Sequence, residues 1–129
     1  MKVHPDFPGL FIVDHPLIQH KLSAMREKTT PHYDFKALLR EISLLMGYAI
    51  TENLSLTTRK IDTPIEEMDA PVLTEEEPVI VPVLRAGLGM ADALHQIMPH
   101  SAYGHVGLYR DETTHRPVEY LVRLPAVKD

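Results

Sequence analysis

The sequence predicts an α/β fold, and three observations lead to that class. A continuous apolar run from Val79 to Leu84 ends in a glycine-rich turn, as a buried strand of a parallel sheet does. Helical spacing follows from Leu88 to Met98, so strand, turn and helix make half of a βαβ unit. Two strand-like segments, Ser101 to Leu108 and Val118 to Leu124, come next. The 129 residues are the length of one domain.

Composition excludes several classes of protein. Hydrophobic residues make up 44% and charged residues 24% of the chain, which is ordinary for a globular domain. A formal net charge of −5 argues against a nucleic-acid-binding face, which needs clustered Lys and Arg. The chain has no cysteine, so disulfides and thiolate zinc sites are excluded. Without a long apolar run or a signal-peptide layout, we expect a soluble, cytoplasmic protein that does not bind membranes.

The first elements are an arm and a helix. Residues 1–13 are expected to be an extended arm, in which only Leu10 to Val13 is strand-like. Asp14 can cap a helix and Pro16 fits a first helical turn, so a helix is predicted over about residues 15–27.

The strongest helical pattern follows. It predicts a helix from Phe35 through roughly residue 52, with Asp34 as the N-cap. The apolar stripe expected to face the core consists of Phe35, Leu38, Leu39, Ile42, Leu45, Met46, Ala49 and Ile50.

The segment 53–77 has a weaker pattern. Leu54 to Leu56 and Arg59 to Thr63 are possible short strands. Glu66 and Glu67, and the triplet Glu75 to Glu77, are expected to be solvated connectors, not a metal site.

Proline and loop length shape the expected sheet. Pro82 lacks the N–H that a central strand donates, so a local irregularity is expected within the strand at Val79 to Leu84. Pro99 ends the following helix. The link Asp111 to Arg116 is too short for a parallel crossover, so its flanking strands must form an antiparallel hairpin.

The sharpest chemical signal is the turn Leu84-Arg85-Ala86-Gly87-Leu88-Gly89. Glycines let backbone amides approach an anion, a helix N-terminus favours negative charge, and Arg85 can add a bidentate fork. The turn is therefore either an anion site or a plain strand-to-helix connection. Arg110, at a strand end beside a loop, either closes over a bound phosphate or is solvated, paired with Asp111.

Eight histidines raise the question of a metal site. Their spacing contains no HExxH pattern, and His15 and His20 fit one helical face poorly. We therefore expect no protein metal site. His95 is expected to pack or cap at its helix end, and His105 to lie in a strand.

Five consecutive segments resemble the uracil phosphoribosyltransferases, which have the type I phosphoribosyltransferase fold. The resemblance covers roughly residues 11–125. The segments are DHPLIQHKLSAMR, FKALLREISLLMGYAIT, VIVPVLRAGLGM, GHVGLYRD and PVEYLVRLP.

The resemblance implies the fold, the reaction and the partners. It implies a type I sheet with flanking helices and an antiparallel hairpin. It also implies transfer of phosphoribosyl from 5-phospho-α-D-ribose 1-diphosphate (PRPP) to uracil, giving UMP and diphosphate in pyrimidine salvage. Mg²⁺ would arrive with PRPP, and the protein would be a homo-oligomer.

The resemblance also assigns roles to particular residues. Arg85 and Arg110 would bind PRPP, and Ala86 and Gly87 would offer backbone to its diphosphate. A strained or cis peptide is expected near Arg85 and Ala86. The mobile hairpin loop covering the site would consist of Asp111, Glu112, Thr113, Thr114, His115 and Arg116.

The sequence departs from the family pattern after its last matching block. In the family, an acidic, glycine-rich segment that holds ribose phosphate follows, and then a uracil-recognising segment; this chain stops at Asp129. We therefore expect a domain truncated at its C-terminus and inactive alone, whether fragment, split protein or remnant. The alternatives are a non-catalytic remnant, such as a dimerisation fragment built on the helix from Phe35 to Ile50, and an RNA-binding relative of the pyrimidine operon regulators.

Overall fold

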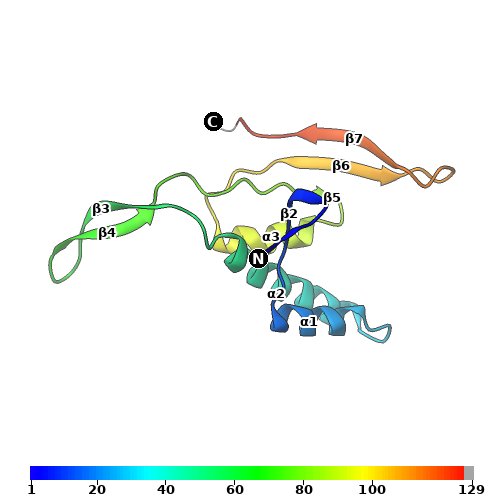
Figure 1. Ribbon diagram of the computed structural model, residues 1–129, viewed down its shortest axis with the longest axis horizontal. Coiled ribbons are helices and arrows are strands. Elements are labelled where there is room, and N and C mark those ends of the chain that lie inside the picture. The colour runs from blue at the N-terminus through cyan, green and yellow to red at the C-terminus, as the bar shows by residue number, and fades with distance from the viewer. Residues whose placement is uncertain (127–129) are drawn as a thin grey trace.

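The computed structural model describes residues 1–126 and contains helices and three separate sheets (Figure 1). The sheets pair β1 with β2, β3 with β4, and β5, β6 and β7 in that order. The elements are β1 (Lys2–His4), β2 (Phe7–Ile12), α1 (Pro16–Arg26), α2 (His32–Ile50), β3 (Leu56–Asp62), β4 (Glu67–Leu73), β5 (Val83–Leu84), α3 (Leu88–Ile97), β6 (His105–Arg110) and β7 (Pro117–Arg123).

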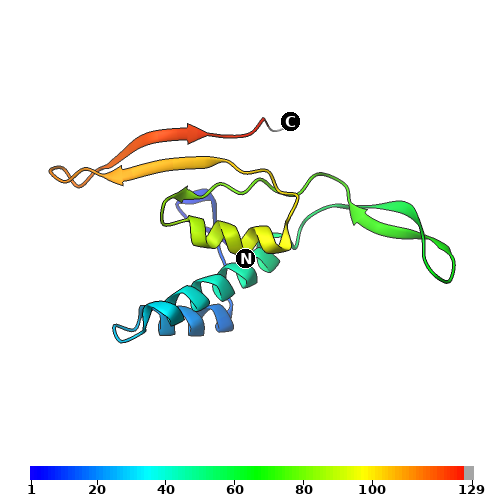
Figure 2. The ribbon, with the colours of Figure 1, turned by 180° about the vertical axis from the view of Figure 1, so that it is seen from behind.

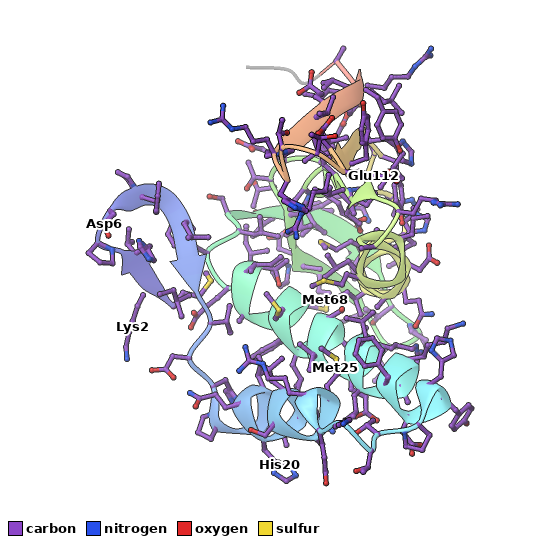
Figure 3. The ribbon with its side chains drawn as sticks, turned by 90° about the vertical axis from the view of Figure 1, so that its right-hand side faces the viewer. Lys2, Asp6, His20, Met25, Met68 and Glu112 are labelled. Carbon is purple, nitrogen blue, oxygen red and sulfur yellow. The ribbon has the colours of Figure 1, made fainter. Side chains whose placement is uncertain are left out.

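The N-terminal arm is an antiparallel hairpin, with more strand than the sequence predicted. Lys2 pairs with Ile12 and Val3 with Phe11, and the register shifts before His4. Every residue of β2 is exposed. Figure 3 shows this hairpin, which carries Lys2 and Asp6, standing to one side of the helices.

Both predicted N-terminal helices exist, but their predicted caps were wrong. The cap of α1 is His15, whose Nδ1 accepts a hydrogen bond of 3.2 Å from the Leu17 N–H. The Asp14 carboxylate instead binds Lys2 Nζ at 2.5 Å and the Gln19 side chain. α2 begins after Pro31, so Asp34 lies inside its first turn, where a negative charge still suits the helix dipole.

The second and third helices pack closely because α2 carries small residues on the face toward α3. Ser43 and Gly47 are buried there, and a Cβ at position 47 would lie 2.5 Å from Ile97 Cδ1. Arg40 also hydrogen-bonds Gln96 on α3 at 2.5 Å. The predicted stripe is buried at Ile42, whereas its end residues, Phe35 and Ile50, are exposed.

β3 and β4 form a long hairpin with an unbroken register from Leu56 opposite Leu73 to Asp62 opposite Glu67. The two short strands predicted near its start are one strand. Glu67 was wrongly expected to be a connector, because it pairs within β4. Figures 1 and 2 show that this hairpin and the β6–β7 hairpin point to opposite ends of the molecule.

The Glu75 to Glu77 segment follows this hairpin. Glu75 and Glu76 are exposed, as predicted, whereas Glu77 is half-buried. The Glu77 carboxylate accepts a hydrogen bond of 2.7 Å from the His100 N–H, so it joins two segments of the chain.

The strand predicted from Val79 to Leu84 is regular only at Val83 and Leu84. An isolated parallel bridge joins Ile80 to Tyr103, and the irregularity expected at Pro82 separates the bridge from β5. The prediction that both faces are buried was wrong. Ile80 is 6% exposed, whereas Val81 and Val83 on the other face are 40% and 47% exposed.

The C-terminal sheet has the predicted topology. β5 pairs with β6 in parallel and β6 pairs with β7 in antiparallel orientation, as expected for a hairpin. β6 begins at His105, four residues later than predicted.

The core lies between α3 and this sheet. Ile80, Ala91 and Met98 are buried together, with Leu94 and Tyr103 packed against them. The Tyr103 hydroxyl donates a hydrogen bond of 3.0 Å to the Ala91 carbonyl. No helix within residues 1–126 has the length and apolarity needed to cross a bilayer.

Candidate anion-binding site

The predicted turn between strand and helix is present. β5 ends at Leu84, residues 85–87 turn, and α3 begins at Leu88. The Gly87 N–H donates to the Val83 carbonyl at 2.8 Å. The peptide bond between Leu84 and Arg85 is cis, next to the place where the sequence predicted an unusual peptide.

The backbone conformation of Gly87 does not require a glycine, since its φ of −74° is open to any residue. The requirement comes instead from how closely the chain approaches β5 at this position. A Cβ at position 87 would lie 2.8 Å from the Val83 nitrogen and 2.9 Å from its oxygen. Both are backbone atoms of a paired strand and cannot move aside. The glycine therefore allows the chain to fold back tightly from β5 into α3.

The turn has groups that suit an anion. Within residues 1–126, the N–H groups of Ala86, Gly89 and Met90 donate to no protein acceptor. Arg85 is exposed, and its guanidinium makes no ion pair or hydrogen bond with the described residues, although its carbonyl accepts a hydrogen bond of 3.2 Å from the Leu88 N–H. Free amides at a helix N-terminus beside a guanidinium attract negative charge.

Arg85, Ala86 and Gly87 line neither of two spaces of about 510 Å³ that the structure contains. A groove of about 510 Å³ lies instead between the C-terminal ends of α2 and α3 and the base of the β3–β4 hairpin. A second space of similar volume lies at the N-terminal hairpin, around Phe7 to Leu10. We place the candidate site by its chemistry, because neither of these spaces has a cationic lining.

The structure does not bring the two predicted arginines together. Leu84 lies opposite Gly107, so Arg110 stands three residues farther along, roughly 10 Å in a strand. Strand alternation also places the Arg110 side chain on the sheet face opposite that of Tyr109. Joint action of Arg85 and Arg110 on one ligand stays a prediction.

The loop from Asp111 to Arg116 is folded around one carboxylate. Asp111 Oδ1 accepts hydrogen bonds from the N–H groups of Thr113 at 2.9 Å and Thr114 at 2.7 Å. These amides, with the Thr114 hydroxyl, lower the pKa of Asp111 below its ordinary value. His115 has a φ of 56°, in the left-handed region of backbone conformations. Figure 3 labels Glu112, which lies in the same loop.

Asp111 makes no ion pair with Arg110 among the described residues. The structure therefore does not support the alternative in which Arg110 forms an ion pair with Asp111. The predicted mobility of the loop stays a prediction.

No group of three His, Cys, Asp or Glu side chains within residues 1–126 could hold a metal ion. Two of the histidines instead pack against Tyr103. The His95 ring meets it edge-on at 5.1 Å and the His105 ring stacks on it at 6.0 Å. The expectations that His95 packs and that His105 lies in a strand are confirmed.

Sequence reasoning did not single out Tyr120, whose ring lies over Gly107 in the neighbouring strand. The only signal in the sequence was a glycine inside a predicted strand, which often marks the close approach of another group.

Comparisons with known proteins identify the family of the chain. A family model described as uracil phosphoribosyltransferase matches residues 12–129. The chain belongs to the uracil phosphoribosyltransferase family. This membership includes the segments that carry Arg85, Gly87 and Arg110.

Two curated relatives named uracil phosphoribosyltransferase illustrate the similarity. The chain is 59% identical over 123 residues to the protein of Paraburkholderia phymatum, covering 95% of this chain and 56% of the relative. It is 57% identical over 129 residues to the protein of Burkholderia mallei, covering 100% of this chain and 59% of that relative. The chain thus spans between half and two thirds of the length of these relatives.

A solved structure confirms the predicted fold class. A protein from Aquifex aeolicus matches with a TM-score of 0.80 and 32% identity, covering 89% of this chain and 55% of that one. The α/β arrangement with flanking helices and an antiparallel hairpin is therefore the arrangement of a known fold.

Proposed function

We propose that the protein transfers the phosphoribosyl group of PRPP to uracil, releasing diphosphate and forming UMP. Family membership supports the reaction. The observation that carries it at the level of residues is the turn from Arg85 to Gly89, where a free guanidinium stands beside the free N–H groups of Ala86 and Gly89 at a helix N-terminus. The Gly87 N–H, which was also expected to face the diphosphate, is bonded to the Val83 carbonyl instead. Diphosphate is the part of PRPP that this turn suits.

The chemistry explains why such a turn would accelerate the reaction. Substitution at the anomeric carbon breaks the bond to diphosphate, so negative charge grows on the leaving group in the transition state. Cationic and N–H groups already aimed at that charge stabilise the transition state more than the bound substrate. Arg85 and the amides of Ala86 and Gly89 would have this role.

The β6–β7 hairpin would supply a cover. Closing the loop Asp111 to Arg116 over bound PRPP would exclude water that otherwise hydrolyses it. Arg110, the last residue of β6 before this loop, would add a second cation to the phosphates.

Magnesium is proposed to arrive with the substrate. The described residues offer no cluster of ligands, and the Asp111 carboxylate is already used by the loop amides. Mg²⁺ often binds proteins through phosphate oxygens, and it would neutralise charge on the diphosphate of PRPP.

We also propose a cytoplasmic homo-oligomer. Large apolar side chains are exposed on two of the hairpins. Phe7 and Phe11 lie on the β1–β2 hairpin, and Ile65 lies in the loop between β3 and β4. Exposed apolar patches of this kind mark protein–protein contacts. The expectation that residues 1–129 are inactive by themselves stays a prediction, which an assay of UMP formation checks.

Titration of the chain with PRPP and Mg²⁺, followed by calorimetry, tests the site. Arg85→Ala removes a charge-assisted contact and should weaken PRPP binding at least about tenfold. Arg59→Ala is the matched control, because Arg59 is an exposed arginine on β3, far along the chain from the turn.

Equal PRPP affinity in the wild-type and Arg85→Ala chains would refute the proposed site. RNA binding that is insensitive to Arg85→Ala, with no PRPP binding, would favour the regulatory alternative.

A further inference from the structure

The ring of Tyr120 occupies the place that a side chain at position 107 would take. A Cβ at Gly107 would lie 2.5 Å from Tyr120 Cζ and 2.6 Å from Cε2. The register explains how the ring reaches β6. Gly107 pairs with Leu121 and Leu108 with Glu119, so Tyr120 is the extra residue of a β-bulge.

Tyr120 lies on the face of the sheet that α3 covers. Tyr103 marks this face, because its hydroxyl bonds the Ala91 carbonyl of α3. His105 stacks on Tyr103, as residues two apart on one strand face do, and Gly107 continues the same row. Since the Tyr120 ring fills the Cβ position of Gly107, it shares that face.

The register also places the ring near the candidate anion site. Gly107 lies opposite Leu84, the last residue of β5, and Arg85 comes directly after it. Adjacent strands are about 5 Å apart, so the hydroxyl end of the Tyr120 ring lies roughly one strand spacing from the start of the turn. Tyr120 is 56% exposed, and its hydroxyl has no hydrogen-bond partner among residues 1–126.

Packing alone would not need that hydroxyl. The ring would cover Gly107 equally well as phenylalanine, yet the sequence places an O–H donor on the ring atom that lies over Gly107. An exposed phenol beside a guanidinium and free amides adds one donor to a set that suits phosphate oxygens.

We propose that Tyr120 is a further binding residue, whose hydroxyl donates a hydrogen bond to a phosphate oxygen of PRPP held at the Arg85 turn. Gly107 makes this possible, because any side chain there would push the ring away. The inference rests on the proposed function, since it assigns Tyr120 to the same ligand.

Calorimetric titration with PRPP and Mg²⁺ separates the inference from the proposed function. Tyr120→Phe keeps the ring over Gly107 and removes only the hydroxyl, and it should weaken PRPP binding about tenfold. Tyr109→Phe is the matched control, because Tyr109 is another exposed tyrosine, 6.2 Å away between ring centroids. Its substitution should leave the affinity unchanged.

Tyrosine absorption gives a second readout, because the chain has five tyrosines and no tryptophan. PRPP should produce a difference spectrum that persists in Tyr109→Phe and disappears in Tyr120→Phe.

The outcomes distinguish the role of Tyr120 from the proposed site. Unchanged PRPP affinity in Tyr120→Phe, or equal losses in both tyrosine variants, overturns the role of Tyr120. If Arg85→Ala nevertheless weakens binding, the proposed site survives. A wild-type chain that binds no PRPP overturns both.

Discussion

At the scale of single residues, one carboxylate organises the loop that would cover the site. Asp111 accepts two backbone hydrogen bonds, from Thr113 and Thr114, and its own N–H donates to the Arg116 carbonyl at 2.9 Å. These bonds favour the ionised carboxylate. The sequence indicated a polar turn but could not show this pattern, because it depends on the loop conformation at His115.

Acid should therefore loosen the loop. The folded-state pKa of Asp111 lies below its ordinary value of 3.8, so the stabilisation is complete above that pH and is lost as pH falls through the lower folded-state pKa. The amide NMR signals of Thr113 and Thr114 should follow this titration. Asp111→Asn should abolish the pH dependence and Glu112→Gln should keep it. A midpoint at or above pH 3.8 would contradict the expected shift.

At the scale of elements, small residues decide how α2 meets α3. Ser43 is fully buried, and its hydroxyl donates to the Leu39 carbonyl at 2.7 Å, within its own helix. Gly47 lies one turn farther along the same face, against Leu94 and Ile97. The position of Ser43 therefore has little room for a larger side chain.

Overpacking at this position should destabilise the chain. Ser43→Leu adds volume between two packed helices and should lower the free energy of unfolding by about 1–3 kcal/mol. Ser43→Ala, the matched control, removes only a locally bonded hydroxyl and should change it by less than about 1 kcal/mol. Urea denaturation measures both changes. A Leu variant as stable as the wild type would mean that the two helices can separate there at little cost.

Elements whose pattern lies within one short segment were predictable from the sequence. Elements whose extent depends on packing or pairing with a distant segment of the chain were not. The helical stripe around Ile42 and the short loop after Arg110 sufficed to predict α2 and the β6–β7 hairpin. Ser43 and Gly47 escaped notice because hydrophobic spacing does not register small residues. The extent of β3 and β4 depends on their mutual pairing, which a polar, weakly alternating sequence does not reveal.

The candidate site divides in the same way. The turn at Gly87 was predictable, because its residues are consecutive. The position of Arg110 relative to this turn depends on the parallel register of β5 and β6. The position of the Tyr120 ring over Gly107 depends on a bulge in β7. Neither can be derived from spacing along the chain.

At the scale of the whole molecule, residues 1–126 cover the C-terminal sheet on one face and leave much of the other exposed. α3 packs on the face that contains Tyr103, while Val83, Val106 and Val122 lie in one row on the other. Parallel strands are ordinarily covered on both faces. We call the exposed part of this surface the open face, which consists of Val81, Val83, Val122 and Leu124.

The open face should bind apolar probes in the native state. Nile red, an uncharged dye, should fluoresce in the presence of the folded chain, because a contiguous apolar surface excludes water from the dye. Val122→Lys places a charge among these side chains and should reduce the fluorescence. Since Val122 is 48% exposed, the change should leave the fold intact, as circular dichroism would check. Thr57→Lys adds the same charge to the exposed β3 strand and should leave the dye signal unchanged. If the two variants bind the dye equally, the open face is not the apolar surface that solvent reaches, and another part of the chain must cover it in solution.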